Sequence, residues 1–263
     1  MMMVAKVVGD NFIWNCLWVL LLVSSLTRAL ESDVNCLRAL KSQLKDPNGH
    51  LSNWVFGNKN ENYICKFNGV TCWHDDFTNS VFSIDFSGFD LQGDFPDGVK
   101  ECSSLVGLYL SRNNLSGTLP SDIFSLLGYL TALDLSYNSF SGKIPATWSN
   151  ISYLDTLLLD HNQFTGHIPP GLASNPRLKQ LSVAHNHLQG PIPEFTNGNT
   201  SLWSFEDNPD LCGFPMDPCP ESFFSMAIII AAAATAVCFP VGAVIGWLCI
   251  SVGEKRKQRP TRR

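Results

Sequence analysis

The middle of the chain carries a motif that recurs with a period of 24 or 25 residues. Five copies begin at Val81, Leu105, Leu130, Leu154 and Leu178, and the second reads LVGLYLSRNNLSGTLP. An L-x-x-L-x-L segment repeated every roughly 20 to 29 residues is the signature of a leucine-rich-repeat solenoid, in which each unit buries its apolar face against its neighbours. We therefore predict an α/β solenoid, a short right-handed superhelix of leucine-rich repeats over residues 81–201.

Each residue type in the motif has a structural role. The leucines alternate as they do in a strand, which directs Leu108 and Leu110 of the second copy into the core. A column of asparagines follows the strands, where each side-chain amide can bond backbone groups that the turn leaves unpaired. This column contains Asn113, Asn138, Asn162 and Asn186. The first copy has Phe89 in the asparagine column, so we expect its turn to be capped differently.

Both ends of a solenoid need a cap, because an open repeat would expose its core. Residues 30–80 are predicted to form the N-terminal cap, with an amphipathic helix over 33–46 that has Asp33 as its N-cap. The sequence PNG at 47–49 would end this helix. Residues 202–222, where LWSFEDNPDLCG begins a further repeat and abandons it at Cys212, are predicted to form the C-terminal cap.

Two apolar segments flank the repeat region. The first, FIWNCLWVLLLV at 12–23, is too short to span a bilayer and has the length of a signal-peptide core. The small residues of SSLTRA offer a cleavage site near Ala29. We predict a signal peptide over residues 1–29, with an uncleaved N-terminal anchor as the alternative.

The second apolar segment, residues 226–252, contains 27 residues without a charge. As a helix it would reach about 40 Å, enough to cross the hydrocarbon core of a membrane. We predict a single transmembrane helix over 225–252 and a basic cytoplasmic tail over 253–263, giving a type I protein of the plasma membrane. Gly242 and Gly246 have the G-x-x-x-G spacing that allows helices to associate closely.

Cysteine usage agrees with an extracellular domain. Six of the nine cysteines fall between the two apolar segments, an even number that suggests disulfides. Cys65 and Cys72 are seven residues apart, and so are Cys212 and Cys219, so each pair can close locally. If both pairs form, Cys36 and Cys102 remain for each other. Six cysteines allow fifteen connectivities, and proximity in sequence alone favours this one.

Charge and motifs argue against several functions. The net charge is −5, although residues 254–263 carry six basic side chains against one acidic, so the rest of the chain is acidic and unsuited to nucleic acid. No phosphate-binding loop or nucleophile elbow is present, and we predict no enzyme activity, cofactor or metal. His161, His185 and His187 recur at near-equivalent positions and could stack on one face, for which drift between repeats is a simpler explanation than zinc.

Surface residues supply the candidate sites. Asn114, Asn150 and Asn199 begin N-x-S/T sequons and are candidate glycosylation sites. The residues between the core leucines should point to the concave face or its edge, where Tyr and Arg are frequent interface anchors. The candidate partner-binding residues are Tyr109, Arg112, Asp134, Tyr137, Leu158, Asp160, His161 and His185, with Gln180 beside them.

Several segments resemble a known family. DPNGHLSNW, CKFNGVTC, LSGTLP and DLCG are similar to the ectodomains of plant leucine-rich-repeat receptor-like kinases. The short array, DVNCL at 33–37 and ICKFNGVTCWHDD at 64–76 look most like the BIR subfamily of receptor pseudokinases. The resemblance covers most of the chain from about residue 31, but the kinase-like cytoplasmic domain of that subfamily is missing. It implies a partner among leucine-rich-repeat receptor kinases or somatic-embryogenesis-type co-receptors, whose signalling the protein restrains.

We therefore predict a non-catalytic, membrane-anchored receptor-like protein whose repeat domain binds another receptor or co-receptor ectodomain. The first alternative is the N-terminal part of a receptor-like (pseudo)kinase, shortened by splicing or by the gene model. The second is a defence-related protein that inhibits microbial enzymes, against which the membrane span counts.

Overall fold

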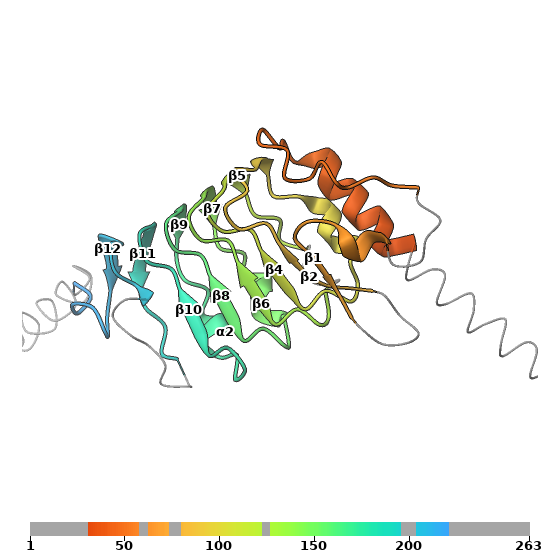
Figure 1. Ribbon diagram of the computed structural model, residues 1–263. Helices are drawn as coiled ribbons and strands as arrows, with labels where there is room; N and C mark the ends of the chain where they lie inside the picture. The colour runs from red at the N-terminus through yellow and green to blue at the C-terminus, as the bar shows by residue number, and fades with distance from the viewer. Residues whose placement is uncertain (1–30, 58–62, 74–79, 123–126, 196–203, 221–263) are drawn as a thin grey trace, which may run out of the picture. The chain divides into compact units, whose positions relative to one another are not determined.

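The computed structural model describes residues 31–57, 63–73, 80–122, 127–195 and 204–220 (Figure 1). The repeat region and its N-terminal cap belong to one compact unit that ends at Pro218. Because the repeats place one strand of each copy beside the equivalent strand of the next, this unit is built from two ladders of short strands. The prediction of a leucine-rich-repeat solenoid is confirmed for this part of the chain.

The first sheet has the strand order β1-β2-β4-β6-β8-β10. Strand β1 (Val70–Cys72) belongs to the cap and pairs antiparallel with β2, whereas the other neighbours are parallel. The remaining strands are β2 (Val81–Asp85), β4 (Gly107–Tyr109), β6 (Ala132–Asp134), β8 (Thr156–Leu158) and β10 (Gln180–Ser182). Strands β4, β6, β8 and β10 are each centred on the second leucine of the L-x-x-L-x-L segment, and β2 covers the corresponding segment of the first copy, so the first sheet follows directly from the period.

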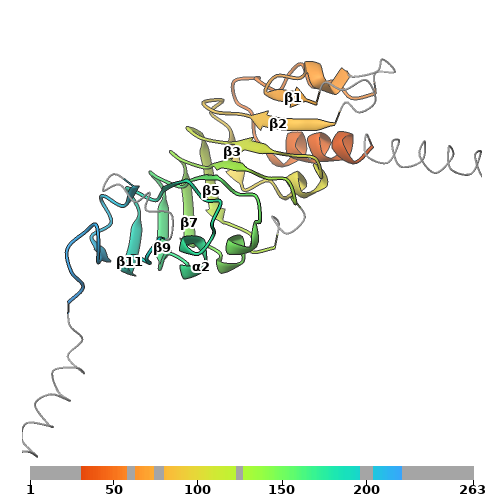
Figure 2. The same ribbon diagram turned by 90° about the horizontal axis from the view of Figure 1, so that it is seen from below.

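The second sheet has the order β12-β11-β9-β7-β5-β3, and Figure 2 shows several of its strands side by side. Its strands are β3 (Gln92–Asp94), β5 (Asn114–Thr118), β7 (Ser139–Lys143), β9 (Gln163–Gly166), β11 (His187–Pro191) and β12 (Asp210–Cys212). Short helices follow it in several repeats, namely η2 (Asp97–Glu101), η4 (Ala146–Asn150) and α2 (Pro170–Ala173). A further 3-10 turn, η1 (Tyr63–Lys66), lies in the cap.

The apolar positions of the motif form one continuous core. Leu108, Leu133 and Leu157 stand at the centres of β4, β6 and β8, in register with one another and fully buried. Phe140 and Phe164 of the second sheet are equally buried. Stacked repeats therefore bury a row of leucines from one ladder and a mixed row of Leu115, Phe140, Phe164 and Leu188 from the other.

The asparagine column is a ladder of hydrogen bonds between repeats. The amide nitrogen of Asn162 donates to the carbonyls of Leu135, Leu159 and Asp160, at 2.9, 3.1 and 3.2 Å. Its amide oxygen accepts from the N–H of Phe140 at 3.0 Å. Asn113, Asn138 and Asn186 bond in the same way. Each asparagine thus holds its own turn and the turn of the preceding repeat, as the motif predicts.

Both ends of the ladder depart from the motif. In the first repeat, Phe89 stacks on Phe86 and on His50 of the cap, with ring centroids 5.8 and 4.5 Å apart. At the other end, Asn208 is buried and its amide donates to the carbonyls of Val183, Phe205 and Glu206. The C-terminal cap therefore continues the ladder with Asn208, which the sequence interpretation missed because its spacing from Asn186 is 22 residues.

The N-terminal helix differs from the prediction. Among the described residues the helix covers 31–43, so Asp33 lies within it and the assignment of Asp33 as N-cap is wrong. The Asp33 side chain instead turns into the protein and accepts a hydrogen bond from the N–H of Val81. The predicted C-terminal limit at 46 is also wrong, because Lys45 pairs with Gln92 in an antiparallel bridge beside β3.

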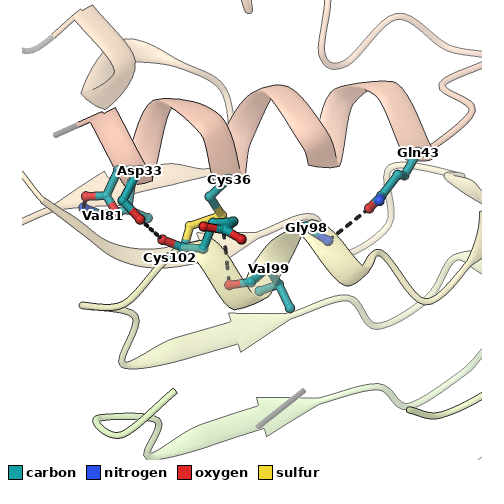
Figure 3. The surroundings of a disulfide bond; sticks show 9 residues. Asp33, Cys36, Gln43, Val81, Gly98, Val99 and Cys102 are labelled. Carbon is teal, nitrogen blue, oxygen red and sulfur yellow. Dashed lines mark hydrogen bonds between the residues drawn. A yellow bond between two sulfur atoms is a disulfide. The ribbon is translucent and has the colours of Figure 1, made fainter. Parts of the chain in front are cut away.

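A disulfide joins this helix to the first repeat. Cys36 in the helix and Cys102 after η2 are bonded and fully buried (Figure 3). The N–H of Gly98 in η2 donates to the Gln43 side chain at the other end of the helix. A second disulfide joins Cys65 in η1 to Cys72 in β1. These are two of the pairs favoured by the sequence, and Cys212 and Cys219 are also disulfide-bonded.

The described residues contain no helix with the length and hydropathy needed to span a membrane. The predicted signal peptide (1–29), the transmembrane segment (225–252) with Gly242 and Gly246, and the basic tail (253–263) lie outside the described residues, as does Asn199.

Candidate docking surface on the first sheet

Three candidate residues, Tyr109, Asp134 and Leu158, form a row with Asp85 across the open face of the first sheet. Strand register places Asp85 beside Tyr109, Tyr109 beside Asp134, and Asp134 beside Leu158. They point away from the core because side chains alternate along a strand and the intervening residues are buried leucines or isoleucine. The row presents two carboxylates, a phenol and the half-buried aliphatic side chain of Leu158.

Tyr109 lies over the neighbouring Gly107 on the same strand. A Cβ atom added to Gly107 would stand 2.8 Å from Cε2 of the Tyr109 ring and 3.2 Å from its hydroxyl oxygen. The absence of a side chain at position 107 therefore lets the ring lie against the sheet. Burial raises the pKa of the Tyr109 phenol, and the carboxylates of Asp85 and Asp134 raise it further. The phenol is held protonated and can donate a hydrogen bond to a partner.

A second row lies at the ends of the strands and has an unusual backbone. Each of its members stands immediately before a ladder asparagine and has a positive φ between 51° and 55°. The members are Arg112, Tyr137, His161, His185 and Asp207, and we call this row the ridge. The left-handed conformation costs an L-residue roughly 1–2 kcal/mol, and glycine or asparagine usually occupies it. Here it carries large side chains instead.

The ridge side chains stack on one another. The Arg112 guanidinium lies 4.8 Å from the centroid of the Tyr137 ring, in the arrangement of a cation–π contact. The rings of Tyr137 and His161 are stacked with centroids 3.9 Å apart, and those of His161 and His185 are 4.0 Å apart. His185 Nδ1 then lies 2.8 Å from the carboxylate of Asp207. The ridge is thus continuous over five successive turns.

Carboxylates border the histidines of the ridge. Asp160 Oδ2 lies 3.0 Å from Nδ1 of His161, and Glu206 Oε1 lies 3.7 Å from Nε2 of His185. Together with Asp207 they make the C-terminal end of the ridge acidic, whereas Arg112 makes the other end basic. No group of three or more His, Cys, Asp and Glu side chains in the described parts of the chain has the geometry to hold a metal.

The structure places the other sequence candidates as follows. Gln180 is exposed on β10, in register with Thr156 and outside both rows. His187 lies on β11 of the second sheet and does not join the histidines of the ridge. Asn114 at the start of β5 and Asn150 at the end of η4 are both exposed. Glycosylation at these two positions stays a prediction.

Sequence reasoning identified the ridge residues up to His185 as surface candidates and anticipated that histidines could stack, which is correct for His161 and His185 but not for His187. It missed Asp207 and the extension of the stack to Tyr137 and Arg112. The available signal was positional, since all five directly precede an asparagine of the ladder. Asp207 can be assigned to the ridge only after Asn208 is recognised as a residue of the asparagine ladder. The Tyr109–Gly107 contact carries no sequence signal, because the equivalent position holds Ser83, Ala132, Thr156 and Gln180 in the other repeats and so has no characteristic residue.

Comparison with known proteins places this domain. Residues 30–73 match the leucine rich repeat N-terminal domain, and residues 103–164 match the leucine rich repeat. A leucine-rich repeat receptor-like protein kinase of Arabidopsis thaliana is 54% identical over 130 residues, which are 49% of this chain and 21% of the relative. The Arabidopsis inactive LRR receptor-like serine/threonine-protein kinase BIR2 is 38% identical over 109 residues, 41% of this chain and 18% of the relative.

The crystal structure of the BIR2 ectodomain from Arabidopsis thaliana is matched with a TM-score of 0.68 and 38% identity, over 71% of this chain and 98% of that chain. The chain belongs to the plant leucine-rich-repeat receptor-like kinase family. Its repeat domain is also similar to a chain in the crystal structure of the Arabidopsis BIR3–SERK2 complex, with a TM-score of 0.67, 41% identity and coverage of 71% and 98%. The chain spans about a fifth of the length of the curated relatives it matches.

Proposed function

We propose that this protein is a non-catalytic, membrane-anchored receptor-like protein whose repeat domain binds the ectodomain of another leucine-rich-repeat receptor or co-receptor and restrains its signalling. The observation that carries the proposal is the similarity to a chain of the BIR3–SERK2 complex, at 41% identity over 98% of that chain. The relative BIR2, whose name describes an inactive kinase, supports a role that needs no catalysis.

The open face of the first sheet is the surface that we propose for the contact. Tyr109 and Leu158 provide bulk on this face, while Asp85 and Asp134 provide charge. The side chains next to the row are small, with Ser83, Gly107 and Ala132 in register on β2, β4 and β6. A partner can therefore approach the backbone closely around a few large side chains, the arrangement typical of interface hot spots.

The membrane anchor is part of the proposal. We propose that residues 1–29 direct secretion, that 225–252 cross the membrane once, and that 253–263 stay on the cytoplasmic side, where basic residues are retained. Association of membrane helices through Gly242 and Gly246 would bring the protein beside its partner's helix. This topology places the repeat domain, its disulfides and its sequons outside the cell.

The proposal is tested by measuring binding of the full chain, held in lipid nanodiscs, to the purified SERK2 ectodomain. Binding at micromolar concentration or tighter is expected. Absence of detectable binding at tens of micromolar contradicts the proposal. Empty nanodiscs measure adsorption to lipid, and an unrelated leucine-rich-repeat ectodomain measures nonspecific contact between solenoids.

A second candidate is that the chain forms the front part of a longer receptor-like (pseudo)kinase. The observation that favours it is the length of the curated relatives, of which the chain spans about a fifth. Sequencing of the 3′ end of the transcript distinguishes the two, because a reading frame that continues into a glycine-rich loop and a strand lysine belongs to a kinase-like domain. The docking surface would serve the same partner in either case.

A further inference from the structure

We propose that the ridge of Arg112, Tyr137, His161, His185 and Asp207 is the edge of the docking surface along which the repeats of the partner ectodomain align, one partner repeat facing each ridge residue. The inference rests on the proposed function. It goes further by naming the residues that orient the partner. It also specifies that a stacked column of repeats, and not an extended peptide, lies along this edge.

The ridge is held rigidly by its backbone. The N–H of His161 donates to the carbonyl of Ala184, and the carbonyl of His161 accepts from the N–H of Asn138. Tyr137 and His185 are bonded on both sides in the same pattern. Since the main chain is fixed and the side chains are stacked, a partner that binds here would lose little conformational entropy in ordering the ridge.

The choice of residues at these positions favours function over structure alone. Asparagine or glycine would adopt the left-handed backbone with less strain. Arg, Tyr and His occupy it instead, and residues held in such conformations cluster at binding sites. The stacked contacts offset part of the strain, but they also place a row of rings at the rim of the open sheet.

The ridge presents ring edges to solvent. Neighbouring side chains cover the ring faces, and the Tyr137 residue is still 40% exposed. The side chains of His161 and His185 are 34% and 36% exposed. Carboxylates already face Nδ1 of His161 and both ring nitrogens of His185. The groups that can bond polar side chains of a partner are therefore the Tyr137 phenol, Nε2 of His161 and the carboxylates beside His185.

The spacing of the ridge side chains indicates which kind of structure binds along the ridge. The ring centroids are 3.9 and 4.0 Å apart, close to the roughly 4.8 Å that separates neighbouring strands. Another leucine-rich-repeat domain presents one equivalent side chain per repeat at that same strand spacing. An extended peptide presents side chains on one side only every roughly 6.7 Å, so it cannot meet successive ridge residues. A repeat column therefore fits the ridge, and an extended peptide does not.

The charge of the ridge gives the contact a direction. Arg112 stands at one end, and Asp160, Glu206 and Asp207 surround the other. A partner column with an acidic side chain near Arg112 and a basic one near Asp207 is complementary in one orientation and repelled in the opposite one.

Crosslinking tests the occupant directly. Benzoylphenylalanine is introduced at position 137 or 185 of the full chain in nanodiscs, and its crosslinks to the SERK2 ectodomain are mapped by mass spectrometry. If repeats align with the ridge, the two crosslinks fall in partner segments about two repeats, or roughly 50 residues, apart. Crosslinks within a few residues of each other would show that a single extended segment occupies the ridge and would overturn the inference.

Binding of variants tests the contribution of the ridge. Tyr137→Gly and His161→Asn remove rings and place residues that tolerate the left-handed backbone, so the fold should keep or gain thermal stability. We expect on the order of tenfold weaker binding to SERK2 for each. Arg112→Glu combined with Asp207→Lys reverses the polarity of the ridge without changing the net charge, and should weaken binding at least as much, most strongly at low salt.

Matched controls lie on the second sheet. Lys143→Glu combined with Asp210→Lys makes the same two charge changes at exposed positions of β7 and β12 and should leave binding unchanged. If the unmodified chain does not bind SERK2, both the proposed function and this inference fail. If it binds and the ridge variants bind equally well, the inference alone fails and the proposed function stands.

Discussion

The carboxylate of Asp33, in the helix of the N-terminal cap, accepts a hydrogen bond of 2.8 Å from the N–H of Val81 at the start of β2. This contact joins the cap to the first repeat next to the Cys36–Cys102 disulfide (Figure 3). The second carboxylate oxygen of Asp33 is buried without a hydrogen-bond partner among the described residues. The cap is therefore held to the repeats through a group whose charge is poorly compensated.

Stability should depend on pH through Asp33. Burial raises the pKa of this carboxyl from 3.8 to about 6, although the Val81 N–H lowers it. The folded protein thus binds the proton more tightly than the unfolded chain, so its contribution to stability is full below about pH 4 and is lost as pH rises through about 6. The loss amounts to roughly 3 kcal/mol at pH 7.

The Asp33→Asn variant isolates this effect. It keeps an oxygen to accept from Val81 but cannot ionise, so the difference in unfolding free energy between the variant and the wild type should change by roughly 3 kcal/mol between pH 4 and pH 7. Denaturant titration at both pH values measures it. A difference that stays constant with pH would show that Asp33 titrates in its ordinary range.

Removal of one ladder asparagine should destabilise the solenoid strongly. In Asn162→Ala the N–H of Phe140 loses its side-chain acceptor, while the carbonyls of Leu135, Leu159 and Asp160 each keep one other donor. We expect a loss of about 2 kcal/mol, because a buried N–H that loses its hydrogen bond keeps the full cost of desolvation. Denaturant unfolding measures the loss, and Gln163→Ala at the neighbouring exposed position is the control. Equal stability of the two variants would contradict the role of the ladder.

The Cys36–Cys102 and Cys65–Cys72 disulfides should differ in their effect on the free energy of unfolding. Cys36–Cys102 closes 66 residues of chain and Cys65–Cys72 closes seven. By loop-closure entropy, removing the first as a double alanine variant should cost about 4 kcal/mol and removing the second about 2.5 kcal/mol. Thermal melting of both variants compares them. A larger loss from Cys65 and Cys72 would mean that local packing in the cap outweighs the constraint on the unfolded chain.

The contact of Tyr109 with Gly107 predicts a specific effect of a methyl group. Gly107→Ala should push the ring off the sheet, since the new Cβ would lie 2.8 Å from Cε2 of the ring. The phenol would gain water, and its pKa should fall toward the ordinary value for tyrosine. Titration of ¹³C-labelled tyrosine by NMR reports this shift. Gly128→Ala, where an added Cβ has no neighbour within 4 Å, is the control that should leave Tyr109 unchanged.

Asn114 and Asn150 should carry glycans when the protein is expressed in a plant secretory pathway. Both are exposed and begin sequons, so the transferase can reach them in the folded or the folding chain. Mass spectrometry of the intact protein measures the mass that is lost when N-glycans are removed. This loss should be smaller by one glycan in Asn114→Gln, and by one glycan in Asn150→Gln, than in the wild type. If either variant loses the same glycan mass as the wild type, the substituted site is not used.

The periodic part of the fold could be predicted from the sequence. The strands, the buried leucines and the asparagine ladder recur at a fixed interval, and each depends on contacts with equivalent residues of the adjacent repeat. The helix of the cap was predicted with less accuracy. The rule that places Asp at an N-cap treats the helix as isolated, whereas Val81 of the first repeat supplies the partner of Asp33.

The sequence by itself determined which residues face the core, which turn the chain and which remain on the surface, because these roles repeat with the period. Only the tertiary structure decided that Arg112, Tyr137, His161, His185 and Asp207 form one continuous stack. Residues one repeat apart in the chain come within about 4 Å when parallel strands pair in register, and the left-handed backbone turns their side chains onto one another. The ridge thus depends on the alignment of repeats, which no single repeat encodes.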